Sequence, residues 1–386
     1  MSSSASDQSF VFDRPLDTRA ELTDRDQQLA ALAEAFSQRR STFVEGLPRH
    51  GKTSVVNVAL ADFASSERHA ALRIDCSGVL TVADLVRRVE DAYAAAWATG
   101  AIEEALIERL DAVSFQVAGA DAENTERRLQ TLLELMVDVA SAHDGRAVVA
   151  LDNVHDVIAV PKIADAVRAA RQRGGDRVSW VFTGPRAFEG EQGLRTRGSR
   201  MVEVGALDPA MFADEVIRRF EATGRDAGET AQVIASVGAG HPQRSSLLAA
   251  QLWALTPEGG RATVAMARAA IDNALIRCSP EFEIGWNALH RNERRVAVAI
   301  ANGIAPQGTR AQRATGLASV SAAQRALQGV RNSGVASVEG DPTALTDPLF
   351  AEWLRRRYPQ APPEPGWQAL RRAGLERGLG HRGITR

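Results

Sequence analysis

Residues 41–54 read STFVEGLPRHGKTS, and their last nine letters contain the complete pattern G-x-x-x-x-G-K-[ST]. A short β-rich run, 41–46, leads into this pattern, and a helix is predicted over 53–64 directly after it. A strand, a glycine-rich turn and a helix N-terminus in this order form a loop whose backbone N–H groups bind phosphate oxygens. The residues predicted to contact a nucleoside triphosphate here are Gly46, Pro48, Arg49, His50, Gly51, Lys52, Thr53 and Ser54.

Lysine is rare in this chain, which makes its presence in the loop informative. The 386 residues include 46 lysines and arginines, of which only Lys52 and Lys162 are lysine. A compact ammonium on a flexible stem reaches between β- and γ-phosphate oxygens, whereas a planar guanidinium is too wide for that position. We therefore expect Lys52 to bind ATP and to take part in its chemistry.

Charge is distributed unevenly along the chain. The formal net charge is −2, but residues 261–386 hold 18 arginines and 10 acidic residues, a net of +8, while residues 1–260 have a net of −10. An acidic N-terminal part and a basic C-terminal part are typical of a nucleotide-binding unit followed by a unit that can bind a polyanion such as double-stranded DNA.

Cysteine, histidine and hydropathy exclude several classes of protein. The two cysteines, Cys76 and Cys278, exclude a disulfide scaffold and a Cys-rich zinc site. The seven histidines show no paired metal-binding spacing. The chain starts without the apolar segment of a signal peptide, and no run approaches 18 apolar residues, so we expect a cytoplasmic protein without membrane contact.

Apolar runs alternate with helical patterns after the loop. Runs at 70–75, 147–152 and 178–183, and a weaker one at 201–204, are predicted strands with helices between them. This alternation predicts an α/β fold, a parallel sheet covered by helices on both faces. The near-continuous apolar character of 147–151 is typical of a central buried strand.

The length suggests two or three domains, and the pattern becomes purely helical from residue 208. A new unit is predicted to begin near Ser279-Pro280, with helices at about 283–300, 309–315 and 321–332. The predicted division is a flexible N-terminal arm over 1–20, a P-loop α/β domain over 21–207, a helical lid over 208–278, a winged-helix domain over 279–359 and a Pro/Arg-rich tail over 360–386.

A magnesium ligand is expected at the end of a strand after the phosphate loop. Asp152 ends the apolar run 147–152, and its carboxylate would hold Mg²⁺ together with the Thr53 hydroxyl. Asn153 follows, where many related ATPases carry glutamate. Because an amide can hold a water but cannot take its proton, hydrolysis should be slow. His155 and Asp156 can orient a water but fit equally well as solvated loop residues.

Two further segments are candidates for contact with the nucleotide. Arg186 follows the strand that ends at Thr183, where a hydroxyl or guanidinium can report the γ-phosphate, although a plain turn fits Arg186 equally well. Pro242, in Gly240-His241-Pro242, opens a helix in the lid, where it shapes a turn against an adenine or simply begins the helix.

The C-terminal unit has the order of a winged helix: a helix, a short helix, a turn, a helix and a β-turn-β wing at 334–342. The helix over 321–332 exposes Arg325, Gln328 and Arg331, which can reach base edges or phosphates. Packing of this module on its own ATPase domain or on a partner fits the sequence equally well.

These segments resemble the AAA+/STAND class of P-loop ATPases, and within it the archaeal-type ATPase family with its ORC/Cdc6-like architecture. The resemblance covers about residues 22–358 and is carried by LTDR at 22–25, GLPRHGKTS, LDNVHD at 151–156, TGPR at 183–186 and GHP at 240–242. It implies an ASCE-type sheet, a helical lid, a C-terminal winged helix and Pro242 near the base. It also implies that ATP/ADP exchange moves the lid and the winged helix.

The leading interpretation is a regulatory ATPase that binds ATP and Mg²⁺, hydrolyses ATP slowly and positions its winged helix toward DNA or a protein partner. A separate effector protein and a nucleotide-dependent homo-oligomer are expected as partners. The alternative is a DNA-transaction ATPase, a loader of the initiator or transposition-helper kind that assembles on DNA. A small-molecule kinase is disfavoured, because such enzymes have no need of a winged helix.

Overall fold

The computed structural model describes residues 10–65, 69–98, 122–142, 146–158, 160–186, 194–195, 198–305, 315–317, 319–336 and 344–359. The chain divides into two compact units, Met1–Val264 and Ala265–Arg386. The Ala-rich helix predicted after residue 101, most of the helix predicted at 309–315 and the tail over 360–386 lie outside the described residues.

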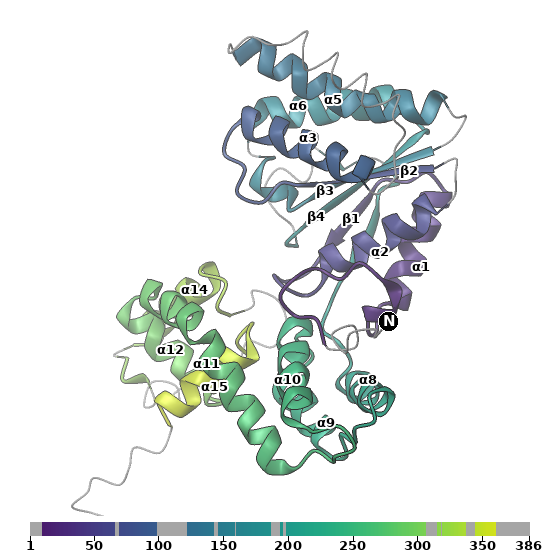
Figure 1. Ribbon diagram of the computed structural model, residues 1–386. Helices are drawn as coiled ribbons and strands as arrows, with labels where there is room; N and C mark the ends of the chain where they lie inside the picture. The colour runs from purple at the N-terminus through teal and green to yellow at the C-terminus, as the bar shows by residue number, and fades with distance from the viewer. Residues whose placement is uncertain are drawn as a thin grey trace, which may run out of the picture. The chain divides into compact units, whose positions relative to one another are not determined.

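The first unit is built on a parallel five-stranded sheet in the order β2-β3-β4-β1-β5 (Figure 1). The strands are β1 (Thr42–Glu45), β2 (His69–Asp75), β3 (Arg146–Asp152), β4 (Val178–Gly184) and β5 (Arg200–Glu203). The predicted α/β fold with a parallel sheet is therefore confirmed. Because all strands run the same way, their carboxyl ends meet at one edge, where ligands bind in sheets of this kind.

Two helices, α1 (Asp26–Ser37) and α2 (Lys52–Ala64), cover one face of the sheet (Figure 1). Their apolar side chains pack on alternate residues of the interior strand β3, namely Val148 and Ala150. α2 thus begins inside the phosphate-loop pattern and is fixed to the sheet by its buried valines, so packing holds its N-terminus at the carboxyl edge of β1.

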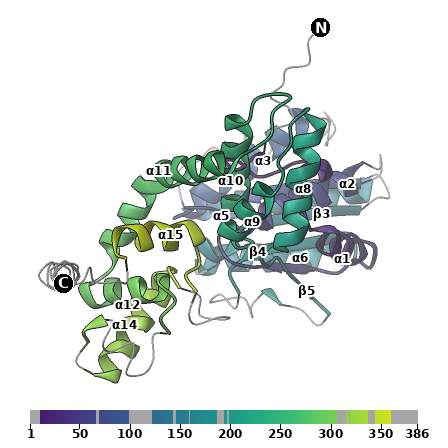
Figure 2. The same ribbon diagram turned by 90° about the horizontal axis from the view of Figure 1, so that it is seen from below.

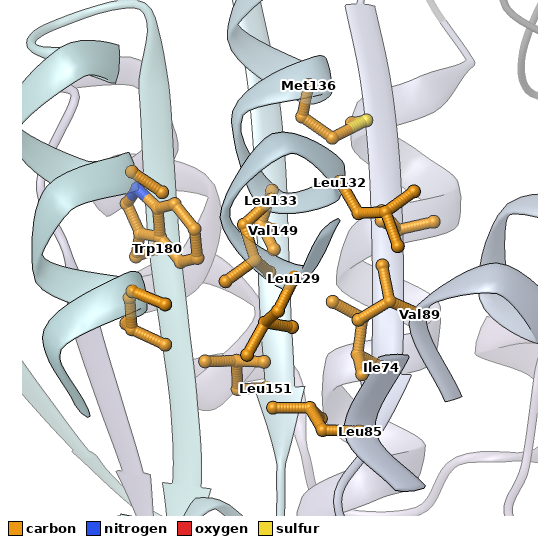
Figure 3. Packing of buried hydrophobic residues seen from close by; sticks show 14 of the residues in the cluster. Ile74, Leu85, Val89, Leu129, Leu132, Leu133, Met136, Val149, Leu151 and Trp180 are labelled. Atoms are coloured by element: carbon orange, nitrogen blue, oxygen red, sulfur yellow. The ribbon is translucent and has the colours of Figure 1, made fainter. Parts of the chain in front are cut away.

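Three helices, α3 (Val82–Ala98), α5 (Ala122–Ala142) and α6 (Pro161–Gly174), pack on the opposite face. Figure 3 shows Leu129 and Met136 of α5 close to Val149 and Leu151 of β3, with Trp180 of β4 to one side. Because β3 is covered on both faces, all its residues after Arg146 are buried, which explains its continuous apolar run.

A bundle of three helices, α8 (Pro209–Ala222), α9 (Thr230–Gly238) and α10 (Pro242–Leu255), follows the sheet (Figure 2). Asp208 caps α8 by accepting hydrogen bonds from the amides of Ala210 and Met211, at 2.8 and 3.0 Å. Gly240 joins the bundle to the end of the sheet. It has φ +74°, its carbonyl accepts from the Leu207 amide at 2.8 Å, and a Cβ there would lie 2.5 Å from the Leu207 carbonyl oxygen.

The second unit contains α11 (Val264–Ala288), α12 (Arg291–Ala301), α14 (Val320–Asn332) and α15 (Pro348–Arg357). Its first helix differs from the predicted boundaries. α11 continues through Pro280, and the break falls instead at Leu289-His290. Cys278 and Phe282, on either side of the proline, are both buried, so packing offsets the hydrogen bond that Pro280 cannot donate.

α12 and α14 lie side by side in this unit (Figure 2). α14 agrees with the helix predicted at 321–332, and Ser319 caps it by accepting from the Ala322 amide at 3.2 Å. An antiparallel bridge joins Ala336 to Leu345, and the segment between them that carries the predicted wing lies outside the described residues. Within the described part of the chain, no helix combines the length and apolarity that crossing a membrane requires.

Candidate nucleotide-binding site

The phosphate-loop pattern forms a tight turn between β1 and α2. A Cβ at Gly46 would lie 2.3 Å from the Val204 carbonyl oxygen, so only glycine fits where the loop leaves the sheet. Gly51 has φ +91°, a left-handed conformation that favours glycine, and it stands directly before the first residue of α2. The strand, the turn and the helix N-terminus thus have the arrangement that phosphate binding requires.

The ammonium of Lys52 lies within this loop. Its Nζ donates hydrogen bonds to the carbonyl oxygens of Gly46 and Leu47, at 2.9 and 3.0 Å. Burial lowers the pKa of Lys52, and the negative charge of Asp152 acts in the opposite direction. The loop carbonyls hold the ammonium at the centre of the turn, where a phosphate group can replace them as its partner.

Thr53, Asp152 and Thr183 form a cluster at the carboxyl edge of the sheet. The Thr53 hydroxyl donates to Asp152 Oδ2 at 2.8 Å, and the Thr183 hydroxyl donates to Asp152 Oδ1. Asp152 is only 2% exposed. A hydroxyl and a carboxylate oxygen therefore lie side by side, and this pair of oxygen donors fits Mg²⁺, which binds through few protein ligands and takes the rest from phosphates and water.

Asn153 adopts the left-handed conformation, with φ +57° and ψ +44°. Its amide N–H donates to Thr183 Oγ1, and its side-chain Nδ2 donates to Ser77 Oγ, both at 2.8 Å. The Ser77 hydroxyl in turn donates to Asp75 Oδ1 at 2.6 Å. Because a carboxylate only accepts, the hydroxyl proton points to Asp75, so Ser77 must accept from Asn153. This chain fixes Nδ2 toward Ser77 and turns the amide oxygen away from it.

One basic residue near Asp152 was not anticipated from the sequence. The Arg73 guanidinium, from β2, lies 3.1 Å from Asp152 Oδ2, the oxygen that also accepts from Thr53. Asp75 and Asp152 are paired in register on the neighbouring strands β2 and β3. Burial acts to raise the pKa of Asp75, but hydrogen bonds from Ser77 and the charges of Arg73 and Arg88 leave it lowered.

A cavity of about 380 Å³ opens beside the loop. The predicted binding residues that line it are Pro48, Arg49, His50, Gly51, Lys52, Thr53, Ser54, Asn153 and Pro242. Leu22, Leu207 and Phe212 add apolar surface. The polar surface at the loop suits the phosphates of a nucleotide, and the apolar surface suits its base.

Residues 10–17, which we call the strap, complete the cavity wall. The Leu16 amide donates to Ser54 Oγ at 3.0 Å, and Gln243 Nε2 of α10 donates to the Phe12 carbonyl oxygen at 3.1 Å. Phe10 is buried against Phe220 of α8, with 6.3 Å between ring centroids. These contacts were not anticipated when residues 1–20 were predicted to be a flexible arm. The only signal was the apolar run at 10–12 within polar sequence.

A buried arginine and a histidine from outside the loop lie against it. Arg25, in the LTDR segment, donates to the carbonyl oxygens of Gly205 at 2.8 Å and His50 at 3.4 Å, and burial lowers its pKa. The rings of His50 and His241 lie 4.8 Å apart, centroid to centroid. His241 Nδ1 accepts from the Arg244 amide at the start of α10. The loop therefore contacts both the N-terminal segment and the helical bundle.

Other predicted site residues lie apart from the cavity. Arg186 Nε lies 3.4 Å from Glu45 Oε1, and Arg186 does not line the cavity. Asp156 accepts from the Gly78 amide at 3.2 Å and lies 3.5 Å from His155 Nε2. In the second unit, Arg325 and Gln328 of α14 are exposed, whereas Arg331 is half-buried and its Nε is buried.

Solved structures share this architecture. The Walker-type ATPase paby2304 of Pyrococcus abyssi superposes with a TM-score of 0.62 at 16% identity, over 89% of this chain and 98% of that one. The ORC2 protein of Aeropyrum pernix, in ADPNP–ADP complexes, gives 0.59 at 13% identity, over 90% and 97% of the two chains. The chain has the P-loop ATPase fold. No protein-family model matches it, and no curated protein does.

The AAA+-type fold expected from the sequence is thereby confirmed, with a sheet order that places the phosphate loop after β1 and Asp152 two strands away on β3. At these identities the likeness concerns the fold alone. The nucleotide, the metal and the partners of this chain have to be argued from its own residues.

Proposed function

We propose that the chain is a nucleotide-dependent regulatory ATPase that binds ATP with Mg²⁺ and hydrolyses it slowly. The observation that carries the proposal is the joint arrangement of Lys52 within the loop and of Thr53 against Asp152. These residues supply the phosphate-binding cation and the two oxygen donors for Mg²⁺. Mg²⁺ held by Thr53 and Asp152 would neutralise negative charge on the phosphates of the bound nucleotide.

Slow hydrolysis follows from the residue beside Asp152. In the role we propose, Asn153 presents its amide oxygen to an attacking water, because its Nδ2 is held by Ser77. An amide oxygen orients a water but does not accept its proton. His155 Nε2 lies 3.5 Å from Asp156, whose carboxylate accepts from the Gly78 amide. Neither residue lines the cavity, which supports weak rather than rapid turnover.

The C-terminal unit is proposed to be a winged-helix module that acts on double-stranded DNA or on a separate protein. The net charge of +8 over residues 261–386 and the exposed Arg325 and Gln328 of α14 support DNA. The loop's contacts to α10 and to the strap support a nucleotide-dependent arrangement of these elements. A nucleotide-dependent homo-oligomer stays a prediction from the sequence.

The chain offers its own matched control for the central experiment, because it contains only two lysines. Lys52→Ala should weaken the binding of a fluorescent ATP analogue by at least about 100-fold, since the phosphate charge loses its partner within the loop. Lys162→Ala removes the same charge from an exposed position on α6, where the lysine pairs with Glu126. That variant should bind like wild type.

If fluorescence titration gave Lys52→Ala and wild type the same affinity for the ATP analogue, the assignment of the loop as the phosphate-binding site would be wrong. Transfer of phosphate from ATP to a small molecule, rather than release of inorganic phosphate, would indicate that the protein is a small-molecule kinase instead.

A further inference from the structure

We propose that Arg73 supplies a fixed positive charge at the magnesium-binding carboxylate and so makes nucleotide binding only weakly dependent on Mg²⁺. The inference rests on the proposed nucleotide site and concerns a residue that is not part of the phosphate-loop pattern. Arg73 would act as a specificity-determining residue, because it decides how much of the affinity comes from the metal.

The Arg73 guanidinium contacts the same carboxylate oxygen of Asp152 that accepts from Thr53. Asp152 Oδ2 accepts from the Thr53 hydroxyl at 2.8 Å and from Arg73 Nη1 at 3.1 Å, while Thr183 occupies Oδ1. The Arg73 side chain is 32% exposed and that of Asp152 only 2%. A buried carboxylate therefore already has a permanent cation beside the oxygen and the hydroxyl that fit Mg²⁺.

The strand register explains why this cation is held in place. Asp75 and Asp152 are opposite each other on β2 and β3, so two carboxylates stand side by side at one edge of the sheet. Arg73 lies two residues before Asp75 on the same strand, therefore on the same face, and its charge acts on both. Lys52, the other basic group near Asp152, is directed by its bonds into the loop.

Two effects follow for nucleotide binding. A guanidinium beside Asp152 lowers the negative potential that attracts a divalent cation, so Mg²⁺ gains less by binding there. The same positive charge attracts triphosphate in the absence of metal. Both effects reduce the ratio between the dissociation constants measured without and with Mg²⁺.

A purely structural role gives a different result. If the ion pair of Arg73 only stabilises this edge of the sheet and its charge does not act on the bound metal or phosphates, its replacement lowers the stability of the protein with or without metal and leaves that ratio unchanged. The metal dependence of nucleotide affinity is thus the measurement that separates the two roles.

The experiment measures the dissociation constants of fluorescent ATP and ADP analogues in saturating Mg²⁺ and in EDTA. For wild type, the ratio of the two constants should stay below about 10. Arg73→Gln should raise the ratio at least about 10-fold and lower the Mg²⁺ concentration that gives half-maximal effect at fixed nucleotide. Arg73→Lys, which keeps the charge, should behave like wild type.

Arg87→Gln is the charge-matched control, because Arg87 is an exposed residue of α3 that pairs with Asp84. A folded Arg73→Gln protein whose ratio is within about two-fold of wild type would overturn the proposal. So would a wild-type ratio above about 100, which needs no variant and therefore decides the matter even if Arg73→Gln does not fold. Absence of nucleotide binding by wild type in both buffers would instead overturn the proposed function itself.

Discussion

The backbone at Asn153 limits which side chains can follow Asp152. Asparagine tolerates the left-handed conformation found there, whereas glutamate pays roughly 1–2 kcal/mol to adopt it. The Asn153 side chain also fills a specific place, because it donates to Ser77. Glutamate, the residue that would be the general base at this position in a faster ATPase, is therefore absent from position 153 and also disfavoured there by the backbone conformation.

Asn153→Glu should therefore change two properties in opposite senses. ATP turnover should rise, because a carboxylate accepts the proton of the attacking water. The free energy of unfolding should fall by about 2–3 kcal/mol, of which about 1–2 kcal/mol comes from the left-handed backbone and about 1 kcal/mol from the lost bond to Ser77. Phosphate release and urea unfolding measure these two effects.

Asn153→Asp serves as the control, because aspartate tolerates the left-handed region and brings a shorter carboxylate. If Asn153→Glu binds ATP like wild type but turns it over no faster, the base position lies elsewhere, and Asp156→Ala becomes the variant to test.

The sequence located some of the site residues and missed others for a clear reason. The loop residues and Thr53 belong to one contiguous pattern, and Asp152 ends a strand that its apolar run makes visible. Arg73 and Ser77 reach the site only through the register between β2 and β3, which pairs residues more than 70 positions apart. A single sequence contains no local signal for that register.

Among the elements, the sheet was the most predictable part of the fold. β3 and β4 are short apolar runs between helical patterns, and burial on both faces makes those runs continuous. α11 was less predictable, since Pro280 suggested a break that tertiary packing of Cys278 and Phe282 overrides. The strap is an irregular segment with a bend at Asp13-Arg14 and without periodicity, so its position depends wholly on tertiary contacts.

The strap offers a test of how an irregular segment affects the cavity. Phe10 anchors it, since the ring is 4% exposed and lies against Phe220, with the Arg219 guanidinium 5.2 Å from its centroid. Phe10→Ala should detach the strap and remove one wall of the cavity. Dissociation of a fluorescent nucleotide, followed by stopped flow, should become at least about 10-fold faster.

Leu80→Ala removes a large apolar side chain that is 82% exposed, and it should leave dissociation unchanged. Limited proteolysis should cut the Phe10→Ala protein within residues 10–17 sooner than wild type. An unchanged dissociation rate together with faster cleavage would show that the strap does not retain the nucleotide.

Across the whole molecule, the two units that we propose to bind nucleotide and DNA differ in net charge and have separate hydrophobic cores. The first unit holds the phosphate loop and its own hydrophobic clusters, and the second holds α14 with the exposed Arg325 and Gln328. Since residues 261–386 have a net charge of +8, binding to DNA by this part should come largely from phosphate contacts and should be sensitive to salt.

Arg325→Ala/Gln328→Ala should weaken binding to duplex DNA and flatten its salt dependence, because the variant loses one cationic contact to phosphate and therefore releases fewer counterions on binding. ATP affinity should stay unchanged, since the phosphate loop belongs to the other compact unit.

Arg331→Ala is expected to differ, because that side chain is half-buried and its loss should lower thermal stability as well. Arg268→Ala, an exposed arginine of α11, is the control for charge alone. The measurement is a salt titration by fluorescence anisotropy. Undetectable binding of wild type at ~50 mM salt, where phosphate contacts are strongest, would favour a protein partner for this module over DNA.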